Sequence, residues 1–512
     1  MPEKKAIYIT TPIYYVNAEP HLGHAYTSIV ADTLIRYYRL NGFDSFFLTG
    51  TDEHGDKVAK AAAAAKESPK EYADKISRLF RNLLPELNIA NNYFIRTTDE
   101  HHKKVVQMIL QKVYDQGDIY FGEYGGYYCF GCERFYLEKE LVDGKCPDHK
   151  VAPEFIKENN YFFKMSKYQQ WLIDHISKHP SFIRPQRYRN EVLSFLKEPL
   201  EDLCISRPAS RISWGVVLPF DQNYVTYVWF DALINYISGI GYPSGELFGK
   251  FWPVVSHMIA KDILKPHAIY WPIMLKAAGI EPYQHLNVHG YWSMAEDKMS
   301  KSIGNVISPL NLKEKYGLDA FRYFLLRDMV FGLDSSFSET ALVNRLNSDL
   351  ANDLGNLINR ALAMAKKYFQ GLIEEPKQFE NEDELLKETA MSTIHDFGNF
   401  MEELAFHKTL LSIWNMIGSV NKYIDTTSPW SLAKDPSKED RLKTVNYNIL
   451  EAIRIISVLI SPFMPDTSQK IQSQLGFDIT KETLSISDIK EWGGLKPGTV
   501  VKKEKPLFPR IE

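Results

Sequence analysis

Residues 6–40 read AIYITTPIYYVNAEPHLGHAYTSIVADTLIRYYRL, and their pattern predicts the first strand, loop and helix of the chain. Its first five residues, Ala6–Thr10, are mostly β-branched or aromatic, which predicts a short buried strand. Residues 11–20 contain two prolines and an asparagine and are expected to form a loop. From Leu22 to Leu40 apolar residues recur at helical spacing. The order is therefore strand, loop and helix, with His21–His24 at the start of the helix.

The alternation of strands and helices continues beyond residue 40. Ser45–Thr49 is a second predicted strand, and it leads into Gly50-Thr-Asp-Glu-His-Gly55. The alanine-rich stretch 59–65 is expected to be helical, and the same alternation returns at 224–241 and 254–288. Strands that alternate with helices indicate a parallel α/β sheet, which binds ligands at the carboxyl ends of its strands.

Two other regions of the chain have a different pattern. Residues 120–230 hold a cysteine cluster and several short β-like runs, which indicates an inserted or connective domain. Residues 338–474 show periodic leucine, isoleucine and phenylalanine, so they are expected to be almost wholly helical, with Pro376 in one of the loops between helices.

The composition is that of a large globular protein. The chain has 512 residues, of which 45% are hydrophobic and 24% are charged, and this length predicts about three domains. It contains no apolar run long enough to cross a membrane and no signal-peptide core, so we expect a cytoplasmic location and no membrane partner. The net charge of −4 argues against a strongly basic nucleic-acid-binding protein, although charge can be segregated by face.

Three of the four cysteines lie close together in the predicted insert. Cys129-Phe-Gly-Cys132 is followed by Cys146-Pro-Asp-His149, so three thiolates and one imidazole can fill the tetrahedral shell of a zinc ion. A site with four protein ligands has no open position for water, and we therefore expect a structural zinc ion. The alternative is three unrelated thiols and a surface histidine. Cys204 has apolar neighbours and is expected to be an inert, buried thiol.

Two short segments have the residue types that bind phosphate. His21 and His24 lie at the start of the first helix, where the N–H groups and the helix dipole favour anions, and Gly23 leaves space for a nucleotide. The segment Lys298-Met-Ser-Lys-Ser302 is polar and close to a glycine, which is typical of a mobile loop whose lysines can act on a triphosphate. The alternatives are a surface or metal-binding histidine pair and a solvated basic turn.

The segment Asp52-Glu53-His54 ends the second predicted strand, where ligand-binding residues are expected in an α/β sheet. A carboxylate at this position can hold an ammonium group. The alternative is a helix N-cap, and the two interpretations are compatible if they apply to different residues of the three.

These residues resemble the HIGH and KMSKS motifs of class I aminoacyl-tRNA synthetases, and among them the chain is most similar to the methionyl-tRNA synthetase family. The likeness covers essentially the whole length. It is also carried by several short segments, namely Thr11–Asn17, Gly50–His54, the cysteine segment 129–149, Ser206-Arg207 with Trp214-Gly215, Val228–Ala232, Lys261-Asp262 with His267, and Asp353–Asn356.

The resemblance implies a fold class and a domain order. The fold is α/β, with a Rossmann-like parallel-sheet catalytic domain that contains a zinc-binding connective insertion, followed by an α-helical bundle that binds the anticodon. The implied form is the shorter bacterial one with one zinc ion. The expected ranges are 1–117 and 223–295 for the two catalytic halves, 118–222 for the insertion with its knuckle at 129–149, 296–350 for the KMSKS loop and stem-contact region, and 351–512 for the anticodon-binding domain.

The resemblance also assigns roles to individual residues. The catalytic residues are His21, His24, Lys298 and Lys301, and the ATP-binding residues are these four with Gly23 and Ser300. Methionine is bound by Ile13, Tyr15, Asp52, Trp229, Ala232, Tyr236, Ile263 and His267. Within this group Asp52 pairs with the α-ammonium, and Tyr15 and His267 can donate to the thioether. The zinc ligands are Cys129, Cys132, Cys146 and His149, and the anticodon is read by Asn356, Arg360 and Trp430. The alternative for Trp430 is a buried core aromatic.

The chain departs from the family pattern at a few positions, none of which loses a charged or hydrogen-bonding group. Leu22 replaces an isoleucine of the HIGH motif, Ala260 replaces a glycine, and Val217 replaces a proline. Leu233 stands where some members have proline, which leaves a pocket role for that position open.

The implied activity is that of a methionine–tRNA ligase. Methionine reacts with ATP·Mg²⁺ to give methionyl-adenylate and pyrophosphate, and the methionyl group is then transferred to tRNA(Met), including the initiator tRNA. The chain ends at residue 512 without an appended OB-fold, so a monomer is expected.

Two other functions fit the residues less well. A cysteinyl- or leucyl-tRNA synthetase would need, respectively, an open catalytic zinc site or room for a large editing insertion. A zinc-containing tRNA-binding protein without catalysis would not need the intact residues His21, His24, Asp52, Lys298 and Lys301.

Overall fold

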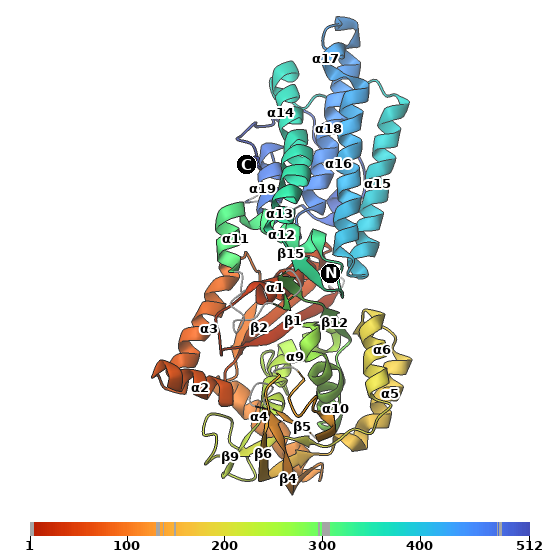
Figure 1. The fold of residues 1–512 in the computed structure, drawn as a ribbon. Coiled ribbons are helices and arrows are strands. Elements are labelled where there is room, and N and C mark those ends of the chain that lie inside the picture. The colour runs from red at the N-terminus through yellow and green to blue at the C-terminus, as the bar shows by residue number, and fades with distance from the viewer. Residues whose placement is uncertain are drawn as a thin grey trace. The chain divides into compact units, whose positions relative to one another are not determined.

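A computed structural model of the chain describes residues 5–129, 134–136, 138–147, 150–294, 297–298, 308–478, 480 and 484–511 (Figure 1). The chain divides into two compact units. The first, called the sheet unit, comprises residues 6–31 and 45–289, and the second, called the helical unit, comprises residues 1–5, 32–44 and 290–512.

A six-stranded sheet forms the centre of the sheet unit, in the order β3-β2-β1-β11-β12-β7. The pairs β1–β11, β11–β12, β12–β7 and β2–β3 are parallel. The strands are β1 (Ala6–Tyr15), β2 (Asp44–Asp52), β3 (Tyr93–Arg96), β7 (Ile183–Arg184), β11 (Val255–Ala260) and β12 (His285–His289). The parallel α/β sheet predicted from the sequence is therefore confirmed.

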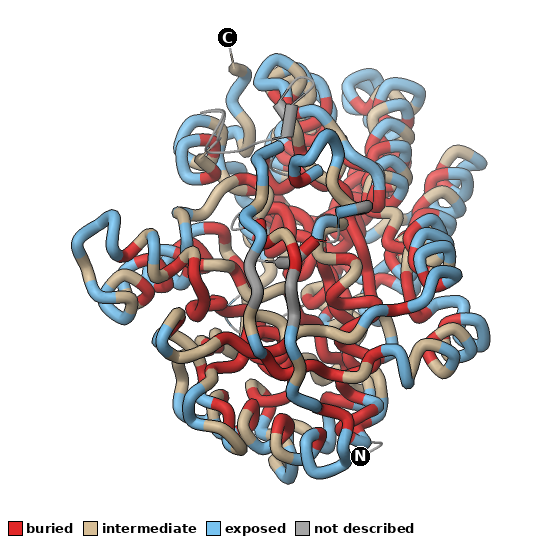
Figure 2. Tube along the Cα trace, turned by 60° about the horizontal axis from the view of Figure 1, so that its bottom comes forward, coloured by how far each residue is buried: buried red, intermediate tan, exposed pale blue. Residues whose placement is uncertain are grey.

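Amphipathic helices pack on this sheet (Figure 1) and share a buried apolar core with its strands. Figure 2 shows buried residues in the interior and exposed residues along the outer turns of the helices. The first of them, α1 (Leu22–Leu40), has the predicted bounds, and its part from Asp32 onward belongs to the helical unit. Helix α3 begins with Pro69 after a capping box of Ser68 and Glu71. The other helices of the unit are α2 (Asp56–Ala65), α3 (Pro69–Glu86), α4 (Glu100–Asp115), α5 (Gln169–Lys178), α6 (Gln186–Phe195), α7 (Trp229–Ala232), α8 (Asn235–Ser238), α9 (Glu246–Phe251) and α10 (Trp271–Ala277).

Strand β1 differs from the expectation, because it continues through Pro12 to Tyr15 instead of ending at Thr10. The ladder with β11 covers only Tyr8–Thr10, so the missing N–H of Pro12 lies beyond that ladder. Strand β2 likewise runs on to Asp52.

The range expected for the insertion contains a second, antiparallel sheet in the order β5-β4-β6-β8 and part of a two-stranded ribbon, β10-β9. One strand of this range, β7, instead pairs with β12 at the edge of the parallel sheet. The strands of these two smaller sheets are β4 (Ile119–Cys129), β5 (Arg134–Tyr136), β6 (Glu154–Phe163), β8 (Leu203–Cys204), β9 (Ser206–Pro208) and β10 (Tyr224–Thr226).

The helical unit is a bundle around α18, which is buried on almost all sides (Figure 1). This confirms the helical region predicted for 338–474, and Pro376 lies in the loop before α15. The helices are α11 (Pro309–Tyr316), α12 (Leu318–Asp328), α13 (Glu339–Arg345), α14 (Asn356–Phe369), α15 (Asn381–Glu402), α16 (Phe406–Thr427), α17 (Pro429–Leu432), α18 (Glu439–Leu459) and α19 (Pro465–Gln474). A small sheet has the order β14-β13-β15, with β13 (Trp292–Met294), β14 (Asp297–Lys298) and β15 (Ser335–Phe337).

Buried ion pairs stabilise the helical unit. Arg322 donates to Asp32 at 2.6 Å, both side chains are fully buried, and the guanidinium also reaches the carbonyls of Pro462 and Phe463. A buried charge is tolerated only when its partners satisfy it, and the carboxylate and the two carbonyls named here all complement the cation.

A second buried carboxylate holds the chain after α19. Glu451 accepts hydrogen bonds from the N–H groups of Gly493, Gly494 and Leu495 and pairs with Arg454 at 2.6 Å. Burial opposes ionisation of Glu451, but Arg454 and these N–H groups outweigh it, so its pKa is lowered.

Among the helices of the described residues, none is long and apolar enough to cross a membrane. The cytoplasmic location and the monomeric state stay predictions.

Candidate active site

The order of the parallel strands determines where the candidate site residues meet. From the central pair β1–β11, the sheet continues outward through β2 and β3 on one side and through β12 and β7 on the other. Ligands bind at such a point of reversal, beyond the carboxyl ends of the strands. His21–His24 follow β1, Asp52–His54 lie at the end of β2, His267 follows β11, and His289 ends β12.

His21 and His24 lie together at the start of α1, as the sequence predicts. Their rings stack with centroids 3.8 Å apart. The N–H of Gly23 donates to Nδ1 of His21 at 3.0 Å, and the N–H of His21 donates to Nδ1 of His24 at 3.2 Å. Because each Nδ1 accepts a hydrogen bond, each neutral ring carries its proton on Nε2 and can donate it to a phosphate oxygen.

Gly23 is required by the position of the His21 ring. A Cβ at residue 23 would lie 2.9 Å from Cε1 and 3.1 Å from Nδ1 of that ring. Any larger residue would displace the imidazole, so the glycine serves the geometry of His21 as well as the approach of a nucleotide.

Four residues to which the sequence analysis assigns no role support this turn. The hydroxyl of Tyr14 donates to the carbonyl of His24, and the Tyr14 ring stacks on Phe80. Thr27 donates to the carbonyl of Gly23 at 3.1 Å, and its hydroxyl lies 2.8 Å from Nε2 of His289. Tyr14 belongs to the segment Thr11–Asn17, but nothing in the sequence links Thr27 to His289, which lies 262 positions away.

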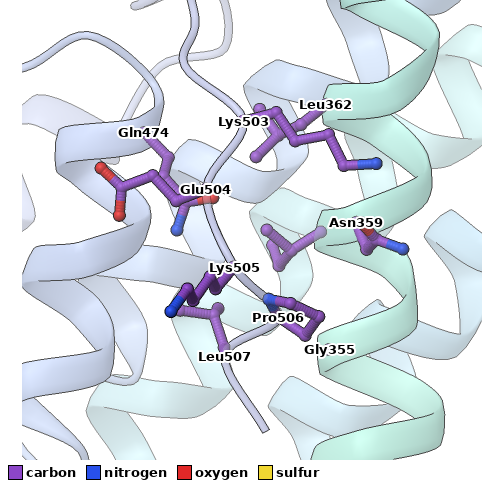
Figure 3. A pocket seen from close by; sticks show the side chains of 10 residues that line it. Gly355, Asn359, Leu362, Gln474, Lys503, Glu504, Lys505, Pro506 and Leu507 are labelled. Atoms are coloured by element: carbon purple, nitrogen blue, oxygen red, sulfur yellow. The ribbon is translucent and has the colours of Figure 1, made fainter. Parts of the chain in front are cut away.

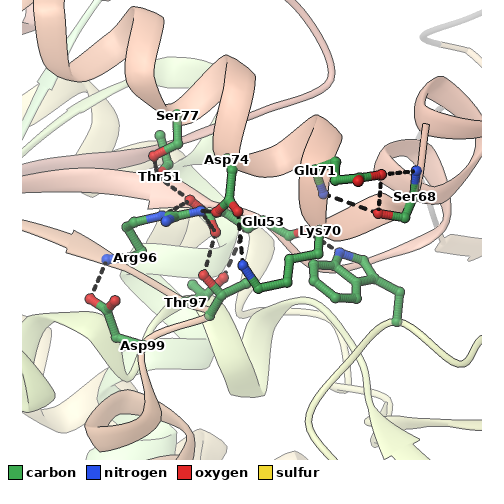
Figure 4. A network of polar contacts seen from close by, with 12 residues as sticks. Thr51, Glu53, Ser68, Lys70, Glu71, Asp74, Ser77, Arg96, Thr97 and Asp99 are labelled. Atoms are coloured by element: carbon green, nitrogen blue, oxygen red, sulfur yellow. Dashed lines mark hydrogen bonds and ion pairs between the residues drawn. The ribbon is translucent and has the colours of Figure 1, made fainter. Parts of the chain in front are cut away.

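Of the three residues at the end of β2, Glu53 is fully buried in a network of polar contacts (Figure 4). Arg96 donates to both carboxylate oxygens of Glu53, at 2.7 and 2.9 Å, and also contacts Asp74. Thr51 and Thr98 donate to the same carboxylate. Glu53 is therefore a structural anchor for the strand end.

His54, next along the chain, is oriented by a buried aspartate. Its Nδ1 lies 2.6 Å from Oδ2 of Asp231, whose other oxygen lies 2.9 Å from Nε2 of His102. Nδ1 of His102 in turn lies 2.8 Å from the hydroxyl of Ser238. Burial raises the pKa of Asp231, but attraction to His54 and hydrogen bonds from His102 and His54 outweigh it, so the pKa is lowered.

None of the three residues caps α2. The N-cap position is Gly55, and no side-chain hydrogen bond closes that end of the helix. The N-cap interpretation of this segment is therefore wrong, and Asp52, which is 8% exposed, stays the predicted ammonium partner.

Tyr236 and His267, both predicted to bind methionine, are in direct contact. His267 lies in a π-helical turn, Pro266–Tyr270, a type of turn that is frequent at functional sites. Its Nδ1 lies 2.9 Å from the carbonyl of Ile263 and its Nε2 lies 2.7 Å from the hydroxyl of Tyr236. Since a carbonyl can only accept, Nδ1 carries the proton and Nε2 accepts from Tyr236.

This arrangement corrects one expectation about His267. Burial lowers its pKa to about 4, with Ile263 and Asp262 opposing that shift, so the ring is neutral at pH 7. The neutral ring has a single N–H, on Nδ1, and donates it to the carbonyl of Ile263. His267 therefore has no N–H to donate to a thioether, and its role here is to hold the Tyr236 hydroxyl.

The other predicted pocket residues divide between two apolar clusters. Ile13, Trp229 and Ile263 are partly buried against the large cluster that contains Tyr236. Tyr15 packs instead against a smaller cluster, and the Lys57 amine lies 5.7 Å from the centre of its ring. The structure shows Ala232 and Leu233 as buried residues.

Val228, immediately before Trp229, has a strained backbone. Its φ is 28°, which is rare for a β-branched residue and costs on the order of 1–3 kcal/mol. Such strain persists only where the surrounding structure holds it, and it is concentrated at functional sites.

The KMSKS segment lies largely outside the described residues. Lys298 belongs to strand β14, which pairs with β13, and only its backbone is described. Ser300 and Lys301 fall among the residues that the structure does not describe. Their role at an ATP site stays a prediction.

Two of the four predicted zinc ligands are described. Cys129 and Cys146 are buried in one small cluster with Tyr136, and Sγ of Cys146 lies 3.4 Å from the Tyr136 hydroxyl. Cys132 and His149 lie outside the described residues, and within the described part no group of three metal-binding side chains occurs. The two buried thiols and the adjacent hydroxyl fit the donors and outer-shell hydrogen bonding that zinc requires.

Cys204 is only half-buried, so the expectation of a buried thiol is wrong. Arg207, itself buried, donates to its sulfur at 3.1 Å and also contacts the Tyr227 ring at 3.8 Å.

The three predicted anticodon residues lie in the helical unit, on α14 and α17. Asn356 is exposed at the start of α14, which contains no acidic residue. Arg360, one turn later, pairs with Asp425 at 2.7 Å. Trp430 is 43% exposed, so the alternative of a buried core aromatic is wrong.

The segment Lys503–Leu507 lies beside α14 and lines a small pocket with residues of that helix (Figure 3). Asn359, between Asn356 and Arg360, is one of the residues that line it. The predicted anticodon surface therefore adjoins the last part of the chain.

The neutral state of His267 predicts a pH dependence of stability. The unfolded ring has a pKa near 6.5 and the folded ring about 4, so the unfolded chain binds more protons between these values. The free energy of unfolding is expected to fall as the pH is lowered from 6.5 to 4, by about 3 kcal/mol in total from this residue. His267→Gln should reduce this slope in urea unfolding, whereas His101→Gln, at an exposed position, should not. An equal slope in the wild type and His267→Gln would contradict the prediction.

Comparison with known proteins gives matches over nearly the whole chain. A family model described as class I tRNA synthetases (M) matches residues 7–152 and 149–362. A second model, the anticodon binding domain of methionyl tRNA ligase, matches residues 373–512.

Individual relatives agree with these matches. The methionine–tRNA ligase of Caldanaerobacter subterraneus is 48% identical over 99% of this chain and 79% of its own length, and that of Clostridium tetani is 49% identical over the same shares. The structure of Mycobacterium tuberculosis methionyl-tRNA synthetase in complex with methionyl-adenylate has a TM-score of 0.95 and 41% identity, and covers 99% of this chain and 100% of that one. The chain therefore belongs to the methionine–tRNA ligase family of class I tRNA synthetases.

Proposed function

We propose that this protein joins methionine to tRNA(Met), including the initiator tRNA, in two steps. In the first, methionine and ATP·Mg²⁺ form methionyl-adenylate and pyrophosphate, and in the second the methionyl group passes to the tRNA. The observation that carries this proposal is the pair of stacked imidazoles, His21 and His24, each with its proton on Nε2 beyond the carboxyl end of β1.

In the first step the carboxylate of methionine attacks the α-phosphorus of ATP in line, and the bond to the pyrophosphate oxygen breaks. Negative charge accumulates on the phosphate oxygens in the transition state, so N–H donors and cations accelerate the step. His21 and His24 supply the donors, and Lys298 and Lys301 supply the cations. Gly23 and Ser300 complete the ATP site.

Methionine is held by Asp52 through its ammonium group and by an apolar pocket around its side chain. Ile13, Trp229, Ala232 and Ile263 supply apolar walls, which suit a polarizable thioether. The aromatic residues Tyr15 and Tyr236 complete the pocket, and His267 orients the Tyr236 hydroxyl through the hydrogen bond described above.

In the second step the terminal ribose hydroxyl of the tRNA attacks the carbonyl carbon of the adenylate, and AMP leaves. Asn356, Arg360 and Trp430 read the anticodon. The absence of acidic residues from α14 and the exposed ring of Trp430 suit contact with RNA, because a base can stack on an exposed aromatic ring.

The domain ranges expected from the sequence are part of the same proposal. Residues 1–117 and 223–295 form the catalytic domain, 118–222 the connective insertion, 296–350 the KMSKS and stem-contact region, and 351–512 the anticodon-binding domain. Cys129, Cys132, Cys146 and His149 hold one zinc ion that cross-links the insertion and takes no part in the chemistry.

The first test is ATP–pyrophosphate exchange with each amino acid in turn. Methionine is expected to stimulate exchange, and Lys301→Ala is expected to lower the rate about 100-fold, because it removes one cation from the developing charge. Lys315→Ala, which removes the exposed partner of Glu339, is the control and should leave the rate unchanged. Exchange with leucine, valine or cysteine but not methionine would overturn the assignment. Undiminished exchange in Lys301→Ala would exclude a catalytic role for the loop.

Zinc content tests the structural metal site. The purified protein is expected to contain about one zinc ion per chain, measured by elemental analysis. Cys146→Ala should lose it, and Cys204→Ala should keep it, because Cys204 lies outside the buried cysteine cluster. Equal zinc content in the two variants would contradict the ligand assignment.

Aminoacylation of tRNA(Met) tests the anticodon surface. Trp430→Ala is expected to raise the KM for tRNA by roughly 10-fold or more, since stacking of one base contributes about 1–3 kcal/mol. The rate of ATP–pyrophosphate exchange, measured without tRNA, should be unchanged in Trp430→Ala. Phe379→Ala, which removes another exposed aromatic ring of the helical unit, is the matched control. Equal KM values for both variants would show that Trp430 does not contact the RNA.

A further inference from the structure

Asp231 is a buried acid that the proposed mechanism does not use. It is 1% exposed, and both of its carboxylate oxygens accept hydrogen bonds from imidazoles of distant segments. His54 comes from the end of β2, at 2.6 Å, and His102 comes from α4, at 2.9 Å. His102 also contacts Ser238 of α8 at 2.8 Å, so one carboxylate joins four elements.

The segment that carries Asp231 also carries two predicted pocket residues. Helix α7 is a single turn, Trp229–Ala232, with Trp229 two positions before Asp231 and Ala232 one position after it. Its backbone hydrogen bonds are local: the N–H groups of Asp231 and Ala232 donate to the carbonyl of Val228, and that of Leu233 donates to Trp229. Such bonds shape the turn but do not join it to distant segments, and the side chain of Asp231 makes that connection.

The backbone of Val228, the residue before α7, makes such a side-chain anchor more important. Val228 has a φ of 28° and a ψ of −80°, a conformation that a β-branched residue avoids. Without a restraint the segment would relax at this residue and carry Trp229 with it. Phe230 is buried in the core, and Asp231 supplies the polar restraint.

We propose that Asp231 is a positioning residue for the methionine pocket, and that its bonds to His54 and His102 hold α7 against the strain at Val228. This inference rests on the proposed function, because it takes Trp229 and Ala232 as walls of that pocket. His54 follows Asp52 by two residues, so the same carboxylate also ties the ammonium-binding end of β2 to the pocket wall.

The chemistry requires a carboxylate at this position. Two acceptor oxygens face two ring N–H groups, so each contact is satisfied. In Asp231→Asn one oxygen becomes an NH₂ group that faces an N–H, and one histidine must change its tautomer or move. The side-chain volume is nearly unchanged, so the substitution tests the hydrogen bonds rather than the packing.

The test measures the KM for methionine and the KM for ATP separately, in ATP–pyrophosphate exchange. Asp231→Asn is expected to raise the KM for methionine about 10-fold or more, as small displacements of binding groups do, with the KM for ATP changed by less than about 2-fold. Asp118→Asn is the matched control. Asp118 is also a buried acid with two partners, Lys167 and Tyr168, but it does not contact α7 or the two histidines. Asp118→Asn should lower the melting temperature of the protein without raising the KM for methionine.

A second substitution tests the link to backbone strain. Val228→Gly allows the positive φ without cost. In this background Asp231→Asn should raise the KM for methionine by less than about 3-fold, because the segment no longer has strain to relax. If Asp231→Asn does not fold, as judged by circular dichroism, His102→Gln replaces it. This variant should likewise raise the KM for methionine and leave the KM for ATP nearly unchanged.

The outcomes separate this inference from the proposed function. A wild-type protein without methionine-dependent exchange would overturn the proposed function. Exchange in the wild type together with an unchanged methionine KM in Asp231→Asn, or in His102→Gln where it is needed, would overturn the positioning role alone. Equal effects on the KM for methionine and for ATP, or an equal rise in Asp118→Asn, would also overturn it. An undiminished effect of Asp231→Asn in the Val228→Gly background would overturn the link to strain.

Discussion

The pairing of β1 with β11 is the constraint on which the rest of the site depends. The side chains of Thr10 and His257, which are 247 positions apart in the chain, lie within hydrogen-bond distance across this pair of strands, at 2.7 Å. Parallel pairing places the carboxyl ends of both at one edge of the sheet, and β2 and β12 continue from them on either side. The stacked histidines, the end of β2 and the π-helical turn of His267 therefore converge, because a parallel sheet collects its carboxyl ends on one side.

Around this edge the functional side chains are held by a second layer of buried polar groups. Glu53 is enclosed by Arg96 and threonine hydroxyls, and Asp231 lies between two histidines. A buried carboxylate is costly unless all its lone pairs are satisfied, so these groups specify one arrangement of the segments that they join. The helical unit uses the same device, since Glu451 holds three backbone N–H groups of the tail and Asp32 holds Arg322.

The fold was largely predictable, because it depends on local patterns. The bounds of α1, the parallel sheet and the helical region follow from hydrophobic periodicity. The sequence predicts that the first strand ends at Thr10, because Pro12 suggests a loop. The observed β1 continues to Tyr15, since a proline that lies beyond the ladder with β11 does not interrupt the strand. The partners of the site residues were not predictable, since Thr27–His289 and His54–Asp231 join segments that are distant in the chain.

The residue types at the site are already evident in the sequence, namely two imidazoles around a glycine, a carboxylate at the end of β2, and the cysteine pairs of the insertion. The sequence also determined the family, through motifs in a fixed order. The protonation and orientation of these groups follow from their contacts in the folded chain. His267 donates its only proton, on Nδ1, to the carbonyl of Ile263 and accepts from Tyr236 at Nε2, so the neutral ring has no N–H left for a thioether. Hydrogen-bond direction depends on which groups meet in space, and chain order does not contain that information.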